Sequence, residues 1–165
     1  MAANKKPRKK YRPKPIIQNP VAFVVDGMQP ADPSLVLTAR LKNHGALKAL
    51  VSGTATQADW QFVCNALNCS VVLAEDLHIG EEYLDEIKAG MLAHALCGRR
   101  AKTHGSFGYT GPQLTAVNTA IEIHDEQLAT ATVRQMESAA AEVKHRLTRK
   151  HFFKAKEIHE SEVPQ

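Results

Sequence analysis

The stretch from Gln113 to Val163, QLTAVNTAIEIHDEQLATATVRQMESAAAEVKHRLTRKHFFKAKEIHESEV, contains neither glycine nor proline. These are the two residues that most strongly interrupt helices. The side chains of its first part that recur at spacings of three and four, the period of a helix with one buried face, are Leu114, Val117, Ile121, His124 and Leu128. The stripe then slips toward Met136, Ala140, Val143 and Leu147, so we expect a bend or stutter near residues 128–133. One very long helix is therefore predicted to dominate an all-α fold.

Three shorter helices are predicted before it. The first begins at Asp32 and Pro33, an N-cap followed by a proline in the first turn, and ends at Ser52-Gly53. The second begins at Thr56, which forms a capping-box pattern with Asp59, and runs to about Gly80. The third covers roughly residues 81–102, with acidic residues at its start and basic residues at its end, as the helix dipole favours. The sequence thus predicts a helical bundle of about four main helices.

Charge is segregated along the chain. Residues 1–20 contain seven basic residues and no acid, residues 21–142 contain eight basic and fourteen acidic residues, and residues 143–156 contain six basic residues and no acid. Like charge and four prolines prevent the first segment from folding. We predict a disordered basic tail over residues 1–20, an extended connector over 21–31, and a helical domain with a long C-terminal helix over 32–165.

The basic tail is the strongest functional signal, because clustered cations release counterions when they contact a phosphate backbone. The C-terminal basic cluster supports the same interpretation. The sequence predicts nucleic-acid binding through Lys5, Lys6, Arg8, Lys9, Lys10, Arg12 and Lys14, with Lys144, Arg146, Arg149 and Lys150 contributing. The alternatives are a terminus that only improves solubility and a protein-interaction module that binds an acidic partner.

A metal-binding bundle is a third alternative. His94 and His124 lie on the stripes of the third and fourth helices, Cys97 follows His94 by one turn, and Glu75-x-x-His78 has a spacing found in di-metal bundles. A second such motif is missing from the sequence. We therefore expect His94 and His124 to be buried hydrogen-bonding groups and expect no metal or other cofactor.

The glycine-rich loop from His104 to Gly111 follows Arg99, Arg100 and Lys102 and precedes a helix, so it could hold an anion. Its spacing matches no known phosphate-binding fingerprint, and such glycines more often allow a turn between helices. Catalytic signatures are also missing. The sequence indicates a non-enzymatic accessory protein.

Three cysteines, Cys64, Cys69 and Cys97, cannot all pair, and the chain begins with lysines rather than an apolar signal segment. These features, with no long apolar run, predict a cytoplasmic protein that does not enter the membrane. The long C-terminal helix would also extend beyond a compact body, and its apolar stripe at Met136, Val143 and Leu147 would then need a cover. A homo-oligomer formed through this helix is therefore predicted.

The stretch Gly108-Tyr-Thr-Gly-Pro-Gln-Leu-Thr-Ala-Val-Asn-Thr-Ala-Ile-Glu-Ile-His-Asp-Glu-Gln-Leu128 resembles small uncharacterised proteins of bacterial viruses and mobile elements. The start Lys-Pro-Arg-Lys-Lys-Tyr-Arg-Pro-Lys-Pro is similar to theirs too. The resemblance implies a phage or plasmid origin and carries no catalytic or binding residues with it.

Overall fold

The computed structural model describes residues 27–149, and within this range it is all-helical. The elements are α2 (Pro33–Ser52), α3 (Gln57–Glu75), the short 3-10 helix η1 (Glu81–Tyr83), α4 (Leu84–His104), α5 (Gly111–Thr130) and α6 (Val133–Thr148). The expected all-α class is confirmed, with five α-helices rather than about four in the described range. The predicted tail over 1–20 lies outside the described residues, as do most of the connector and the chain from Lys150 onward.

The first two helices begin where their caps predict. The side chain of Asp32 accepts a hydrogen bond from the backbone N–H of Ser34 at 2.8 Å, and the left-handed backbone of Gly53 ends α2. Thr56 and Asp59 form a reciprocal capping box at the start of α3. Local side-chain chemistry therefore sets both boundaries, as the sequence indicates.

The link between α3 and α4 is longer than predicted. α3 ends at Glu75 rather than near Gly80, and residues 76–80 form an irregular turn in which His78 and Gly80 both have positive φ angles, of 55° and 72°. The backbone N–H of Ile79 donates to the carbonyl of Leu73 across this turn at 2.9 Å. The turn brings Ile79 and Gly80 against the C-terminal half of α5, where Gly80 faces the side chain of Gln127.

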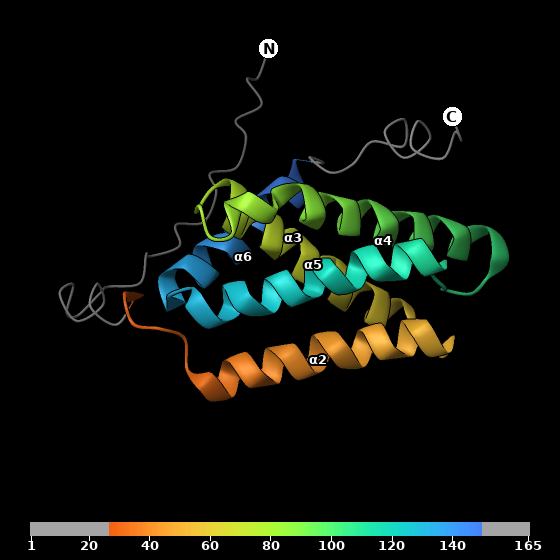
Figure 1. Cartoon of the computed structure of the whole chain (residues 1–165), viewed down its shortest axis with the longest axis horizontal. Helices are drawn as coiled ribbons and strands as arrows, with labels where there is room; N and C mark the ends of the chain where they lie inside the picture. The colour runs from red at the N-terminus through yellow and green to blue at the C-terminus, as the bar shows by residue number, and fades with distance from the viewer. Residues whose placement is uncertain (1–26, 150–165) are drawn as a thin grey trace, which may run out of the picture.

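Helix α3 is the centre of the bundle and packs against α2, α4, α5 and α6. Figure 1 shows α2, α5 and α4 lying side by side in front of it. The core is built from small and branched side chains, and its largest fully buried members include Leu50, Leu67, Leu73, Ile87 and Ile121. Gly90 lets α4 approach α5 closely, since a Cβ atom there would lie 2.4 Å from the Cβ of Ala120.

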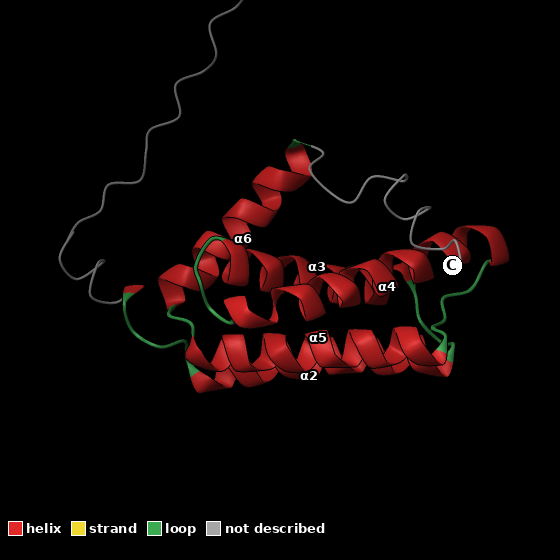
Figure 2. Cartoon of the chain, turned by 45° about the horizontal axis from the view of Figure 1, so that its top comes forward, coloured by secondary structure: helices red, strands yellow, loops and turns green. Residues whose placement is uncertain are grey.

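The single long helix predicted from Gln113 to Val163 is wrong. The chain leaves the helical conformation at Ala131, whose φ and ψ of −69° and 142° are extended, and α6 starts two residues later. The break falls inside the window of residues 128–133 where a bend was expected. Figure 2 shows α6 rising at a steep angle from the other helices.

A capping box produces this break without glycine or proline. The side chain of Thr132 accepts from the backbone N–H of Gln135 at 3.3 Å, and the Gln135 side chain accepts from the backbone N–H of Thr132 at 2.9 Å. The N-terminal part of the described chain fixes the same point, because the N–H of Val133 donates to the carbonyl of Gln29 at 3.1 Å and Pro30 forms a β-bridge with Thr132. These bonds satisfy backbone groups that a helix break would otherwise leave unpaired.

The break turns α6 back onto α3, and this removes the reason for predicting a protruding helix. Ala139 and Val143 are buried in a cluster with Val72 and Leu73 of α3, and Met136 packs against it. Two members of the predicted stripe are exposed: Leu147 at its far end, and Ala140, whose expected place in the core is taken by Ala139. The apolar face of α6 is therefore covered within one chain, and the predicted pairing of two copies through a long C-terminal helix loses its basis.

We expect Val143→Glu to destabilise the fold rather than to separate two copies. A buried, unpaired carboxylate should lower the free energy of unfolding by about 3 kcal/mol. Leu147→Glu adds the same charge one turn later at a side chain that is 48% exposed and should change stability by no more than about 0.5 kcal/mol. Denaturant unfolding of both variants checks the difference, and equal effects would contradict this packing of α6.

No helix among residues 27–149 combines the length and apolar character that crossing a membrane requires.

Candidate functional site

The predicted basic residues do not form one site in the described chain. The seven tail cations from Lys5 to Lys14 and Lys150 lie outside the described residues. Lys144 and Arg149 are exposed on and just after α6. Arg146 is partly buried and lies among carboxylates.

The guanidinium of Arg146 joins α6 to the end of α3. Its three nitrogens pair with Glu75 at 3.0 Å, Asp76 at 2.7 Å and Glu142 at 3.2 Å. Glu75 also pairs with Lys88 of α4 at 2.8 Å. Burial acts to raise the pKa of Glu75, but its pairing with Lys88 and Arg146 lowers the pKa overall. With its donors directed at three carboxylates, Arg146 serves the packing of α6 and is a poor candidate for contact with phosphate.

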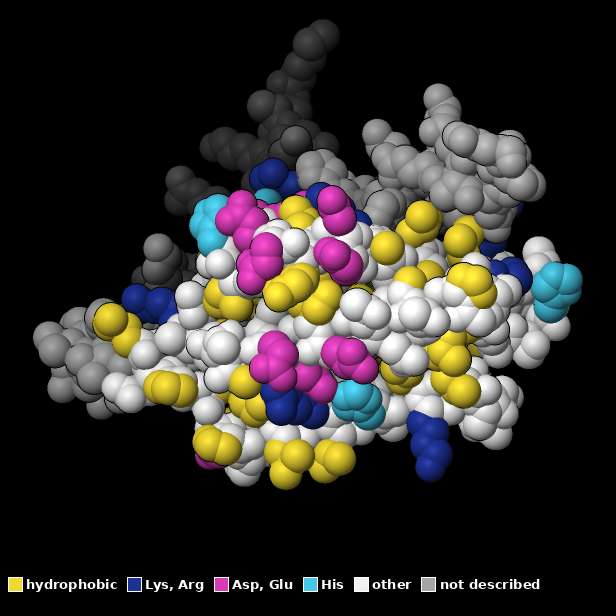
Figure 3. All heavy atoms as spheres, in the orientation of Figure 1, with side chains coloured by type: hydrophobic (Ala, Val, Ile, Leu, Met, Phe, Trp, Pro, Cys, Tyr) yellow, Lys and Arg dark blue, Asp and Glu magenta, His cyan; other side chains and the backbone are white. Residues whose placement is uncertain are grey.

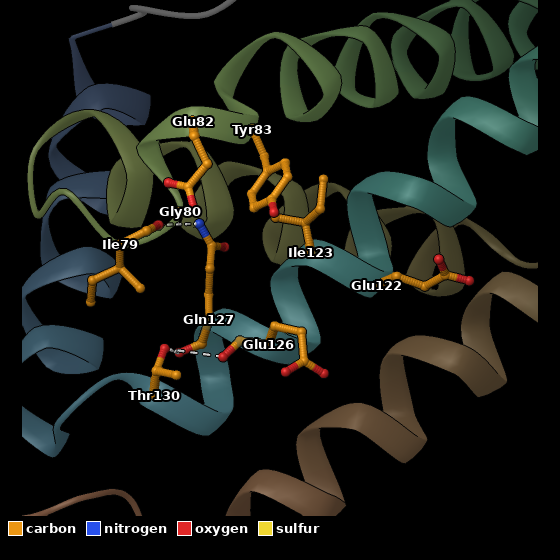
Figure 4. A pocket seen from close by; sticks show the side chains of 9 residues that line it. All are labelled: Ile79, Gly80, Glu82, Tyr83, Glu122, Ile123, Glu126, Gln127 and Thr130. Atoms are coloured by element: carbon orange, nitrogen blue, oxygen red, sulfur yellow. Dashed lines mark hydrogen bonds between the residues drawn. The ribbon is translucent and has the colours of Figure 1, made fainter.

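A hollow of about 390 Å³ opens between the α3–α4 link and α5. We call it the acid-lined hollow. The link side provides Ile79, Gly80, Glu82 and Tyr83. The α5 side provides Glu122, Ile123, Glu126, Gln127 and Thr130. In Figure 4, Gln127 and Ile123 extend toward the link, whereas the side chains of Glu122 and Glu126 point away from it.

Gln127 gives the acid-lined hollow a fixed floor. Its side-chain amide donates to the backbone carbonyls of Ser70 at 3.1 Å and Ile79 at 2.8 Å, and its side-chain oxygen accepts from the Ser70 hydroxyl at 2.6 Å. The side chain is 2% exposed and its hydrogen bonds are formed within the chain. The hollow is therefore held in shape by α3, the link and α5 together.

The walls and the rim of the hollow differ in character. Tyr83 is 47% exposed and Ile79 and Ile123 are half-buried, so the walls offer apolar surface to solvent. Glu82, Glu122 and Glu126 are exposed, and none of them forms an ion pair with another residue in the part of the chain that the structure describes. Figure 3 shows two groups of acidic side chains with apolar side chains close to them, and the lower group also adjoins Lys or Arg and His side chains. Such a surface suits a ligand that has both apolar and cationic groups.

His94 is buried at the contact of α4 with α3. Its Nδ1 lies 2.6 Å from the hydroxyl of Tyr109, its Nε2 lies 2.9 Å from the backbone carbonyl of Trp60, and its ring stacks on the Trp60 indole. A carbonyl only accepts, so Nε2 carries the proton and Nδ1 accepts from Tyr109. Burial lowers the pKa of His94 to about 4, so the ring is neutral at physiological pH. This is the inter-helix hydrogen-bonding role that the sequence predicts.

His124 is buried at the contact of α5 with α2, where burial lowers its pKa to about 4. Its Nδ1 has no hydrogen-bond partner among residues 27–149. Beside it, Asp125 links the two helices by pairing with His44 of α2 at 2.7 Å and by accepting from Arg40 at its backbone carbonyl. This polar contact fixes α2 on α5.

The residues of the metal alternative do not come together. Gly90 of α4 faces Ala116 and Ala120 of α5, which places His94 near the start of α5 and away from His124. The two histidines therefore do not face each other across α4 and α5. Glu75 pairs with Lys88 and Arg146, while His78 pairs with Glu81. Across the described range, no group of three or more potential metal ligands is found.

The glycine-rich loop is fastened by one of the cations that could have held an anion. Arg100 donates to the carbonyl of Gly108 at 2.6 Å and to the side chain of Gln113 at 2.5 Å. Gln113 in turn accepts from the backbone N–H of Thr110. Arg100 therefore closes the connection between α4 and α5.

Sequence reasoning missed the acid-lined hollow. The acidic residues around Glu82 were interpreted as charges at a helix start, and no sequence pattern brought Glu82 and Glu122, forty positions apart, onto one surface. The unexpected turn at residues 76–80 brings these residues together.

Comparison of the chain with protein-family models, curated proteins and solved structures finds no match.

Proposed function

We propose that this protein is a non-enzymatic accessory protein that associates with nucleic acid through the seven cations from Lys5 to Lys14. The observation that carries the proposal is the charge segregation: the first twenty residues contain seven cations and no acid, while residues 21–142 contain fourteen acidic and eight basic residues. A polyanion is attracted to the first and repelled by the second. A phage or plasmid origin, which the sequence resemblance implies, stays a prediction.

The cations of the body support this division of roles. Arg40, Lys88 and Arg146 are paired with carboxylates, and Arg100 holds the loop before α5. Lys144 on α6 and Arg149 just after it are exposed and are available to extend a contact that the tail begins. Affinity should therefore depend mainly on the tail, with little preference for base sequence.

The test measures binding of labelled DNA and RNA by fluorescence anisotropy at several salt concentrations. In a tail-neutral variant, Lys5, Lys6, Arg8, Lys9, Lys10, Arg12 and Lys14 are replaced by glutamine. We expect its affinity at 50 mM salt to fall by about tenfold or more, and its plot of log K against log salt to flatten by about 0.9 for each duplex phosphate that the tail no longer neutralises.

A matched pair of triple variants controls for net charge. Lys9→Gln, Lys10→Gln and Arg12→Gln should weaken binding clearly more than Lys42→Gln, Lys48→Gln and Lys102→Gln, which remove three exposed cations from the body. Equal reductions in affinity would overturn the proposal. If neither DNA nor RNA binds while polyglutamate does, the protein is instead a module for an acidic protein partner.

A further inference from the structure

We infer that the acid-lined hollow is a binding site for a basic peptide segment, and that its occupant is the chain's own stretch from Lys5 to Lys14. Binding in this site would compete with nucleic acid for the same cations. The docking itself does not need nucleic acid, but its effect on affinity rests on the proposed function.

The chemistry of the hollow defines the ligand class. Three exposed glutamates, Glu82, Glu122 and Glu126, line the hollow together with Tyr83 and Ile123, and none of their carboxylates forms an ion pair in the described range. Lysine and arginine side chains combine an apolar stem with a cationic head, so they can cover the apolar wall and reach the rim at the same time. A peptide rich in these residues fits the site better than a small neutral molecule or an anion.

The stretch Lys5-Lys-Pro-Arg-Lys-Lys-Tyr-Arg-Pro-Lys14 has this chemistry. It contains seven cations, no acid, and an aromatic side chain at Tyr11 that could lie on the apolar wall. Two prolines inside it restrict the backbone, so less conformational entropy is lost when it is held against a surface.

The attachment point of this stretch lies near the hollow. Pro30 pairs with Thr132 and the carbonyl of Gln29 accepts from Val133, while Thr130, two residues before that bridge, lines the hollow. Twelve residues separate Lys14 from Gly27, and an extended chain of that length reaches about 40 Å. A tether of this kind gives an effective concentration of about a millimolar, so even weak contacts with the hollow would be populated.

The first experiment uses nuclear magnetic resonance on the full chain without nucleic acid. We expect the backbone amides of Gly80, Ile123 and Gln127 to shift between the natural chain and the tail-neutral variant, and to shift in the same direction when salt is raised from 50 to 500 mM. Amides of α2 far from the hollow, such as that of Val51, should not move. Absence of shifts at the hollow would overturn the inference whether or not the protein binds nucleic acid.

The second experiment measures nucleic-acid affinity in a triple variant with Glu82→Gln, Glu122→Gln and Glu126→Gln. Releasing the tail should raise affinity about three- to tenfold, as expected if the tail is docked for most of the time. A control with Asp85→Asn, Glu86→Gln and Glu137→Gln changes net charge equally at exposed positions outside the hollow and should have a smaller effect. An equal rise in affinity in both triple variants would reflect only the change in net charge and would overturn the proposed binding site.

The dependence of the amide shifts on protein concentration distinguishes docking of the chain's own tail from docking of the tail of a second copy. Shifts that are unchanged between 50 µM and 1 mM protein support docking within one chain. Shifts that grow with concentration, together with a larger mass by light scattering, would place the tail of a second copy in the hollow and overturn docking in cis.

Discussion

Gly90→Ala is expected to lower the free energy of unfolding by about 2–3 kcal/mol, although alanine is the better helix former by about 1 kcal/mol. A Cβ atom at this position would lie 2.4 Å from the Cβ of Ala120 and 2.9 Å from the backbone oxygen of Ala116. The second contact involves backbone, so α4 and α5 must separate along their whole interface. Because the core around this contact is closely packed, the cost spreads to neighbouring side chains.

The same substitution at Gly45 provides the control. Gly45 lies in α2, and a Cβ atom there would have nothing within 4 Å. Gly45→Ala should therefore stabilise the protein by about 0.5–1 kcal/mol. Chemical denaturation of both variants measures the contrast, and a stabilising Gly90→Ala would disprove the close contact of α4 with α5.

Acidification from pH 7 to pH 4 is expected to remove on the order of 3 kcal/mol of stability for each of the two buried histidines, His94 and His124. Burial lowers the pKa of each from 6.5 to about 4 in the folded chain. Between these values the unfolded chain binds protons that the folded chain does not. Stability is therefore fully present above about pH 6.5 and falls as the pH drops toward 4.

Protonation of carboxylates also changes stability, mainly at lower pH. Histidine variants distinguish the contribution of the histidines from that of the carboxylates. Glu75, for example, has a lowered pKa, so its stabilisation is removed only as its own carboxylate becomes protonated. His124→Gln should remove about half of the dependence between pH 6.5 and 4, whereas replacing the exposed His104 with glutamine should leave it unchanged. A stability profile that is flat over this range in the natural chain would contradict neutral, buried histidines.

The fold class and several helix boundaries could be predicted because they depend on local chemistry. Asp32, Thr56 and Gly53 act on neighbouring backbone groups, and their effects are visible within four residues. The break before α6 has the same kind of signal in Thr132 and Gln135. Glycine and proline do not mark this break, and a capping box inside a run of good helix formers is easily taken for continuous helix.

The candidate site could not be predicted because it depends on tertiary contacts. In α4, Ile87, Gly90 and His94 are buried while Ala95 is only partly so, because the contacts of this helix with α5 and α3 determine which face is covered. The acid-lined hollow needs both this packing and the turn at residues 76–80, and neither has a periodic signature.

The junction between α5 and α6 also determines how mechanical force would enter the molecule. Gln29 and Pro30 are joined to Val133 and Thr132 by one backbone hydrogen bond and one β-bridge. Tension applied to the N-terminal segment therefore reaches the start of α6 before it reaches α2. If a bound polymer pulled on the tail, the contacts of Gln29 and Pro30 with the start of α6 should break first. The core between α4 and α5 would stay intact. The junction between α5 and α6 would then open first, and the tail could be stretched without unfolding of the helical body.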